Sequence, residues 1–162
     1  MALNATLKLK GAKQGEIRGS VTQKGRENTI LVLGVDHTML ATLDARSGMF
    51  SGTNRHQPLV ILKELDQATP LLHNALTDGE TLSEFTLRFY RPSATGAEEN
   101  FYTVTLLDAR IVSIRFEMLN NKYPDLAGLK ERERIAFVYQ KIRVSWTTGA
   151  IESDDDWAAP IA

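Results

Sequence analysis

Cysteine is absent from all 162 residues of the chain. This absence excludes disulfides, thiolate zinc sites, iron–sulfur clusters and a cysteine nucleophile. The chain also lacks an excess of charge of either sign. Its 19 Lys and Arg residues are balanced by 20 Asp and Glu residues, which gives a formal net charge of −1. A near-neutral chain argues against a dedicated nucleic-acid surface, which has to neutralise many phosphates. We therefore expect no nucleic-acid partner.

Long hydrophobic runs are also missing. The most apolar stretch, residues 30–35, reads Ile-Leu-Val-Leu-Gly-Val, far short of the roughly 20 residues that a membrane-spanning helix needs. Residues 1–10 alternate apolar and polar side chains, whereas a signal peptide places charge before an unbroken apolar segment. We expect a protein that is cytoplasmic when made, has no cleaved signal peptide and does not insert into a membrane.

The composition that remains is ordinary for a soluble globular protein. Apolar residues make up 43% and charged residues 24% of the chain, which is too apolar for a disordered protein. Its length is close to that of one average domain. We predict a single domain over residues 1–162.

A period of two dominates the pattern and predicts β-strands. Around residue 87, for example, Phe85, Leu87 and Phe89 alternate with polar side chains, as a half-buried strand requires. Segments 29–35 and 59–65 are more uniformly apolar, which is typical of strands covered on both faces. The predicted strands are residues 5–10, 16–21, 29–35, 59–65, 84–91, 100–107, 110–119 and 135–146.

One segment has the helical period. Thr69 is a suitable N-cap, Pro70 fits the first helical position, and Gly79 suits the left-handed residue just past the end. His73 points away from the apolar stripe, so we expect it on the surface. The stripe consists of Leu71, Leu72, Ala75 and Leu76. Eight or so strands with one short helix indicate a mainly-β fold, a small β-barrel with a helix packed on it.

Two segments fit neither period. Residues 41–58 are predicted to form a long extended loop, and a loop of this length in a compact domain is usually functional. Met49 and Phe50 are its large apolar side chains, and such residues often anchor interfaces. Residues 148–162 are predicted to form an acidic C-terminal tail on the surface, in which Trp157 needs a covering partner.

No arrangement of residues predicts catalytic, cofactor-binding or metal sites. His37, His56 and His73 lie 19 and 17 positions apart, without the spacings that bring metal ligands together. We interpret His56, which lies in the long loop, as a polar contact between chains. The chain also lacks a G-x-S-x-G elbow, a phosphate-binding loop and a calcium loop. The sequence therefore favours a protein that is not an enzyme.

Residues 63–80, KELDQATPLLHNALTDGE, form a distinctive strand-into-helix segment with a Thr-Pro start and a Gly-Glu after the helix. This segment is the strongest match by which the chain resembles the hemolysin-coregulated protein (Hcp) family, the tube-forming proteins of bacterial type VI secretion systems. Further matches are Phe89-Tyr90-Arg91, the segment 101–106, Ser51-Gly52 with His56 and Pro58 in the long loop, and Asp155-Asp156-Trp157 near the end. Together these matches run over nearly the whole chain.

The resemblance implies a structural role. It implies a β-barrel that closes into hexameric rings, rings that stack into a tube, and export by a contractile sheath with a spike protein at the tube tip. It also implies that small effector proteins can sit in the lumen, that the protein is secreted without a cleaved signal, and that the long loop reaches a neighbouring subunit. We accordingly predict a subunit interface that includes Met49, Phe50, Ser51, Gly52, His56 and Trp157.

Two other functions compete with this one. A single-domain barrel can be a carrier that holds a small ligand in its mouth; a monomer with one apolar cavity would favour that function. An enzyme that uses scattered carboxylates or His56 is the second alternative, although no spacing among the 20 acidic residues singles out a catalytic pair.

Overall fold

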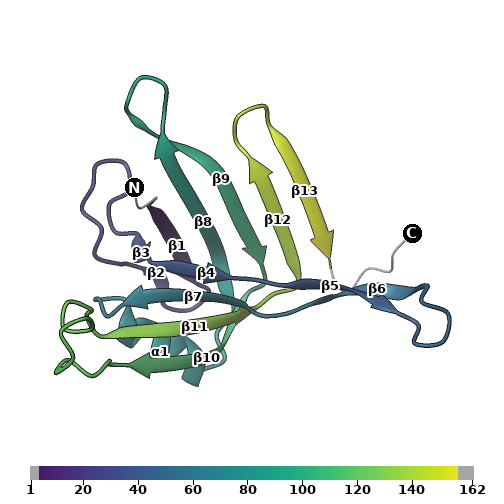
Figure 1. The fold of residues 1–162 in the computed structure, drawn as a ribbon, viewed down its shortest axis with the longest axis horizontal. Helices are drawn as coiled ribbons and strands as arrows, with labels where there is room; N and C mark the ends of the chain where they lie inside the picture. Colours follow the sequence, from purple (N-terminus) through teal and green to yellow (C-terminus); the bar gives the residue numbers. More distant parts are fainter. Residues whose placement is uncertain (1–3, 157–162) are drawn as a thin grey trace.

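The structure is a computed structural model that describes residues 4–156, apart from the side chain of Thr53 (Figure 1). Within this range the chain forms thirteen strands and one helix. The mainly-β fold class predicted from the sequence is confirmed. The strand count is higher than the predicted eight, because some predicted strands are divided and others were not anticipated.

The strands form three sheets. A seven-stranded sheet has the order β13-β12-β9-β8-β1-β2, with β3 also paired to β1. A four-stranded sheet has the order β10-β11-β7-β4, and β5 and β6 form a two-stranded sheet. The strands of the first sheet are β1 (Ala5–Gly11), β2 (Gly15–Ile17), β3 (Ile30–Val32), β8 (Leu82–Pro92), β9 (Glu98–Leu107), β12 (Lys141–Trp146) and β13 (Ile151–Asp156). Those of the other two are β4 (Gly34–Asp36), β7 (Leu59–Glu64), β10 (Arg110–Glu117), β11 (Arg132–Val138), β5 (Met39–Leu43) and β6 (Phe50–His56).

The two larger sheets pack over one hydrophobic core, so the predicted barrel is a barrel-like sandwich rather than one continuous ladder of strands. Phe85 of β8 meets Phe137 of β11 edge to face, with ring centroids 4.9 Å apart. Leu7, Leu87 and Ile61 are fully buried around them. Alternation along each strand places these residues on the inner faces, as the period of two predicted.

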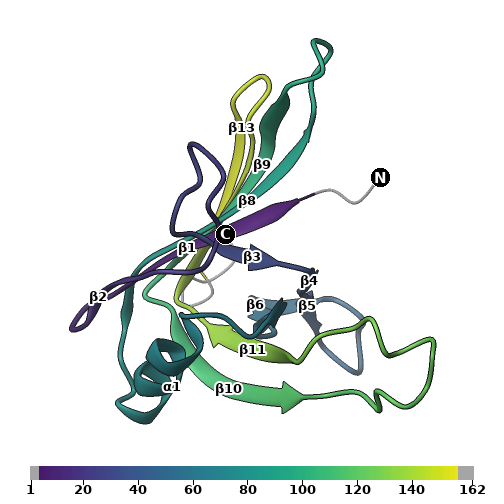
Figure 2. The same ribbon diagram turned by 90° about the vertical axis from the view of Figure 1, so that its left-hand side faces the viewer.

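The helix α1 (Thr69–Thr77) closes one end of the sandwich beside β10 (Figure 2). Leu72 is fully buried and His73 is exposed, so the predicted helix face is confirmed. The helix ends as predicted: Gly79 has φ 60°, its N–H donates to Leu76 O at 3.2 Å, and the Glu80 N–H donates to Ala75 O at 2.9 Å. These two bonds form a Schellman motif.

The predicted N-cap is wrong. Thr69 is already helical, and the cap position belongs to Ala68, whose N–H is bonded at 3.0 Å by the Asp66 carboxylate. The Thr69 hydroxyl instead donates to Glu133 Oε1 of β11 at 2.8 Å. The Thr69 side chain thus bonds a neighbouring strand instead of capping its own helix. The same Glu133 oxygen bonds Nζ of Lys63 at 2.6 Å, and both of these charged side chains are buried.

Four strand predictions need correction. Of residues 16–21 only the first two lie in a strand, β2, because the chain then leaves β1, and the N–H groups of Gly19 and Val21 donate to the carbonyls of Asn28 and Thr29 instead. Residues 135–146 are two strands, because the chain leaves the four-stranded sheet after β11 and joins the seven-stranded sheet as β12. Residues 29–35 contain β3 and β4 and are covered on one face only, since Leu31, Leu33 and Val35 remain 43%, 50% and 37% exposed. Along β7 (residues 59–64), too, buried and half-buried residues alternate.

The predicted extended loop is a β-hairpin. Strands β5 and β6 pair antiparallel, with Met39 opposite His56 and Ala41 opposite Asn54. Figure 1 shows this hairpin projecting from one side of the molecule, away from both larger sheets. We call residues 39–56 the arm.

The predicted acidic tail is also structured in part. Residues 151–156 form β13, which pairs along its whole length with β12 at the edge of the seven-stranded sheet. Asp154 lies opposite Arg143, and Nε of Arg143 donates to its carboxylate at 2.7 Å. A basic neighbouring strand thus offsets the poor strand propensity of the acidic run. Trp157 lies outside the described residues.

Candidate assembly site

Among residues 4–156, no layer covers strand β5 of the arm. All five residues of β5 are exposed, and β5 and β6 pair only with each other among the described strands. An isolated two-stranded hairpin is only marginally stable in water, because it buries little apolar surface. The arm is therefore a projecting element that lacks a core of its own.

The tip of the arm is held by local hydrogen bonds. The Asp44 carboxylate accepts the backbone N–H groups of Arg46 and Ser47, both at 2.8 Å. These bonds to the ionised form lower the pKa of Asp44. Gly48 supplies the left-handed conformation, φ 68°, that closes the turn. The turn presents its flanking strands in a fixed register.

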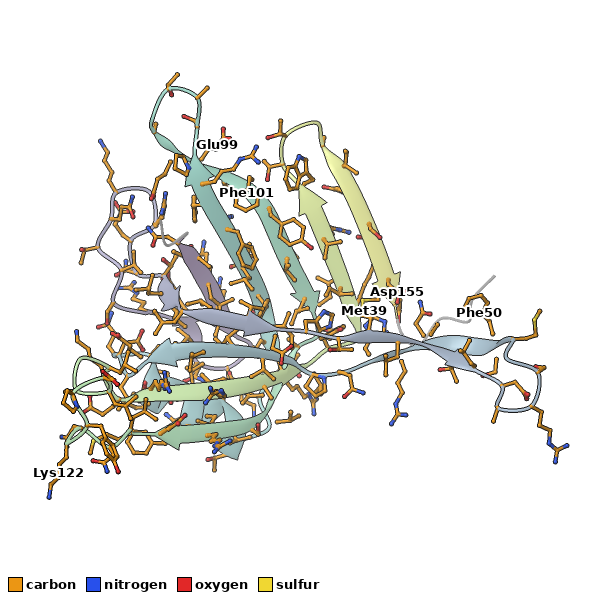
Figure 3. The ribbon with its side chains drawn as sticks, viewed as in Figure 1. Met39, Phe50, Glu99, Phe101, Lys122 and Asp155 are labelled. Atoms are coloured by element: carbon orange, nitrogen blue, oxygen red, sulfur yellow. The ribbon has the colours of Figure 1, made fainter. Side chains whose placement is uncertain are left out.

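Apolar side chains gather on the outer half of the arm. Phe50 is 70% exposed, Met49 67% and Leu43 55%. Figure 3 shows Phe50 far out on the arm, whereas Met39 lies near its base. Ser51 and Gly52 follow in β6 and are also exposed. Four of the predicted interface residues are thus brought together on one exposed element.

The base of the arm is fixed by four side chains from four parts of the chain. Nε2 of His37, after β4, lies 2.6 Å from the Tyr139 hydroxyl, after β11. Nδ1 of His56, at the end of β6, lies 2.8 Å from the same hydroxyl, and its Nε2 lies 2.5 Å from Oδ2 of Asp155 on β13. We call His37, His56, Tyr139 and Asp155 the base junction.

Burial perturbs the proton affinities at the base junction. The His37 pKa is lowered, chiefly by burial and then by the neighbouring His56 ring, with Asp36 acting in the opposite direction. Burial also raises the pKa of Tyr139, and the Asp155 carboxylate adds to this effect. Tyr139 therefore stays protonated and can donate its hydroxyl hydrogen at any ordinary pH.

The structure gives His56 contacts within its own chain, and its predicted contact between chains stays a prediction. Its side chain is only 2% exposed and bonds Tyr139 and Asp155 of the same chain. The ring thus holds the base of the arm from inside. Sequence reasoning missed Tyr139 and Asp155 as its partners, because 83 and 99 positions separate them from His56.

A second apolar surface lies on the body of the molecule. Leu31, Leu33 and Val35 occupy alternate positions along β3 and β4 and remain exposed; we call them the ridge. A groove of about 520 Å³ runs beside Leu31 and Leu33. This groove is open, and charged side chains such as Arg26 and Lys130 also line it, unlike the apolar cavity expected of a ligand carrier.

Two other kinds of site are absent from residues 4–156. That part of the chain contains no cluster of three or more His, Asp or Glu side chains able to hold a metal ion. It also contains no helix whose length and hydropathy would suffice to span a bilayer.

A mainly-β sandwich with an uncovered apolar arm defines a class of assembly-forming protein, and comparison with known proteins gives the family. The model of the family described as "Type VI secretion system effector, Hcp" matches residues 6–146. The "Major exported protein" of Pseudomonas aeruginosa is 37% identical over an alignment of 171 positions, which covers 100% of this chain and 99% of that protein.

Solved structures agree with this assignment. A structure described as "Crystal structure of Hcp protein" has a TM-score of 0.89 at 31% identity, covering 96% of this chain and 98% of the other. The secreted protein Hcp3 of Pseudomonas aeruginosa has a TM-score of 0.77 at 32% identity, covering 96% and 99%. The Hcp1 protein of an Escherichia coli pathovar, EAEC 042, has a TM-score of 0.86 at 28% identity, covering 96% and 99%.

The chain belongs to the Hcp family. It is a structural tube subunit of a type VI secretion system, and the family is one of secreted tube proteins rather than of enzymes.

Proposed function

We propose that this subunit closes head to tail into hexameric rings that stack into a tube, and that the arm makes contacts between subunits. The observation that carries this proposal is the uncovered apolar surface of Leu43, Met49 and Phe50 on an element without a core. Docking against a second copy would bury these side chains and stabilise a hairpin that is marginal alone.

A closed ring needs two different surfaces on each subunit, since head-to-tail contacts are not self-complementary. The ridge supplies a second apolar surface on the body, with Leu33 50% exposed at its centre. Ser51 and Gly52 let a neighbouring backbone approach the arm closely, because their side chains are small. Trp157 belongs to the interface that the sequence predicts, beyond the described residues.

The remaining partners follow from the family. The tube would carry a spike protein at its tip, be driven by contractile sheath proteins and hold small effector proteins in its lumen. The protein would leave the cytoplasm through this machine without a cleaved signal peptide, and it would have no catalytic activity. The relative named "Major exported protein" supports the export part of this proposal.

The substitution Phe50→Asp tests the role of the arm. A charge in place of a buried anchor should shift the purified protein from rings towards monomers and reduce its export, while circular dichroism and the cooperativity of thermal unfolding stay unchanged. Phe50 lies outside the core, so the subunit should still fold. Multi-angle light scattering measures the mass of the assembly.

The matched control is Ala45→Asp, which adds the same charge at an exposed position of the arm without removing a large apolar side chain. It should assemble like the parent protein. If Phe50→Asp assembles and is exported as the parent is, the arm is not an assembly element. If Phe50→Asp unfolds, the side chain belongs to the core of the subunit.

A further inference from the structure

The base junction connects three parts of the fold that lie far apart in the sequence. It joins the arm through His56, the edge strand β13 through Asp155, and the body through Tyr139. The first backbone bonds of the arm lie beside it: Met39 pairs with His56, and the Gln57 N–H donates to Thr38 O at 3.0 Å. Loss of the base junction would therefore release the base of the arm from the body.

The neutral junction has one consistent pattern of hydrogen bonds. The Asp155 carboxylate only accepts, so Nε2 of His56 carries a hydrogen and donates to it at 2.5 Å. Nδ1 of neutral His56 is then an acceptor and takes the Tyr139 hydroxyl hydrogen at 2.8 Å. The Tyr139 oxygen in turn accepts from Nε2 of His37 at 2.6 Å. Every hydrogen in this chain points to an acceptor.

The base junction can bind one added proton and keep all of its hydrogen bonds. When His56 is protonated, its Nδ1–H donates to the Tyr139 oxygen, and the hydroxyl hydrogen turns to Nε2 of His37, which adopts the other tautomer. The Asp155 carboxylate then faces an imidazolium ion, which strengthens that bond. The junction stays closed with a reversed direction of donation.

A second proton cannot be accommodated. With both rings charged, both donate to the Tyr139 oxygen, and the hydroxyl hydrogen has no ring nitrogen to receive it. Two cations then flank a tyrosine that is only 5% exposed. Burial and like-charge repulsion both oppose that state, and they are also the two causes that lower the His37 pKa.

Other charged groups around the junction do not reverse this conclusion. Asp36, next to His37, favours its charged form, but its effect is smaller than those of burial and His56. Lys141 and Arg143 of β12 are paired with Asp154. Arg55 is exposed, and the alternation of a strand directs its side chain to the face opposite that of His56. Asp156 follows Asp155 and faces Lys141 across the strand pair.

We propose that the base junction is an acid-sensitive latch, which holds the arm and β13 to the body with no proton or one proton added and releases them when both histidines are charged. A released His37 regains its ordinary pKa of 6.5, whereas the latched His37 binds a proton less readily. The proton on His37 therefore favours release as pH falls below about 6.5, and this contribution is absent well above that pH.

Release of the arm would also weaken contacts between subunits, and this consequence rests on the proposed function of the arm. Acidification would then loosen the tube by freeing the element that joins its subunits. The latch itself belongs to the single chain and does not depend on that consequence.

Hydrogen exchange measured by mass spectrometry tests the latch. After correction for intrinsic exchange rates, protection at residues 54–57 and 151–156 should fall by about tenfold or more between about pH 7.5 and pH 5, with little change in the core strand β8. Light scattering on the same samples reports assembly separately. A latch that opens without loss of the rings would contradict only the proposed role of the arm in assembly.

Three variants isolate the junction. His37→Gln keeps a side chain that can donate and accept but cannot gain charge, so its protection should stay high at both pH values. Tyr139→Phe removes the shared hydroxyl, so its protection should be low at both. His73→Gln removes an exposed histidine of α1 and should keep the parent's pH response. The proposal is overturned if the parent shows no selective loss at low pH, or if His37→Gln shows the same loss as the parent.

Discussion

Lys63 is a buried charge that is held by a cluster of polar partners. Its side chain has no solvent exposure, and Nζ lies 2.6 Å from Glu133 Oε1 and 3.0 Å from Asp66 Oδ1. Thr69 completes the cluster and ties the start of α1 to the four-stranded sheet. Buried ions contribute to stability only as a complete set, because each alone carries a large desolvation cost.

We predict that Lys63→Met destabilises the subunit by about 3–5 kcal/mol, since it leaves the buried Glu133 carboxylate without a cation. Urea denaturation measures this loss. Lys8→Met is the matched control: Lys8 is exposed and lies 3.9 Å from Glu84, and such surface pairs contribute at most about 1 kcal/mol. Equal losses in the two variants would show that the buried cluster has no special role.

Leu72 and His73 are neighbours on α1 with opposite surroundings. Leu72 is fully buried and His73 is exposed. Leu72→Ala should cost roughly 2–5 kcal/mol through lost transfer energy and the cavity left behind, whereas His73→Ala should change stability by less than about 0.5 kcal/mol. Thermal or chemical unfolding of the two variants decides this, and similar losses would contradict the assigned helix face.

At the scale of elements, the arm is separable from the body. We predict that replacing residues 42–53 with a two-residue Asn-Gly turn leaves the body folded. The flanking residues Ala41 and Asn54 already lie opposite each other in the hairpin, so a short turn can join them. The shortened chain lacks Met49 and Phe50 and should therefore be monomeric or assemble weakly. Circular dichroism and light scattering together test both parts. A loss of folding would show that the arm stabilises the body.

The elements that the sequence predicted are those that touch the core. Strands such as 84–91 and the helix carry a clear period because one face is buried, as Phe85 and Leu72 show. The arm lacks that signal because both faces of β5 are exposed. Strand β13 was missed because its acidic residues are poor strand formers; its pairing depends on Arg143 and Lys141 of β12, which no local pattern reveals.

The residues of the candidate site also differ in how far the sequence alone could predict them. Met49 and Phe50 could be singled out from the sequence, because large apolar side chains stand out in a segment with little else to pack, and their role as interface anchors stays a prediction. The base junction was not, because 102 positions separate His37 from Tyr139 and only the completed fold brings them together. Likewise, a buried lysine such as Lys63 cannot be distinguished from an exposed one until its partners are placed.

At the scale of the whole molecule, two uncovered apolar surfaces support the proposed assembly of this chain. The arm and the ridge leave Phe50 and Leu33 at 70% and 50% exposure, on two separate parts of the molecule. The formal net charge of −1 leaves no large single-sign field to oppose association of identical chains. Apolar contact rather than long-range electrostatics would hold the assembly, so it should tolerate moderate salt.

The mass and shape of the purified protein test this account most directly. Light scattering with negative-stain microscopy should give a mass close to six times the 18.0 kDa of one chain, and annular particles. A monomer that persists over a wide range of concentrations, with no rings in the images, would contradict the account.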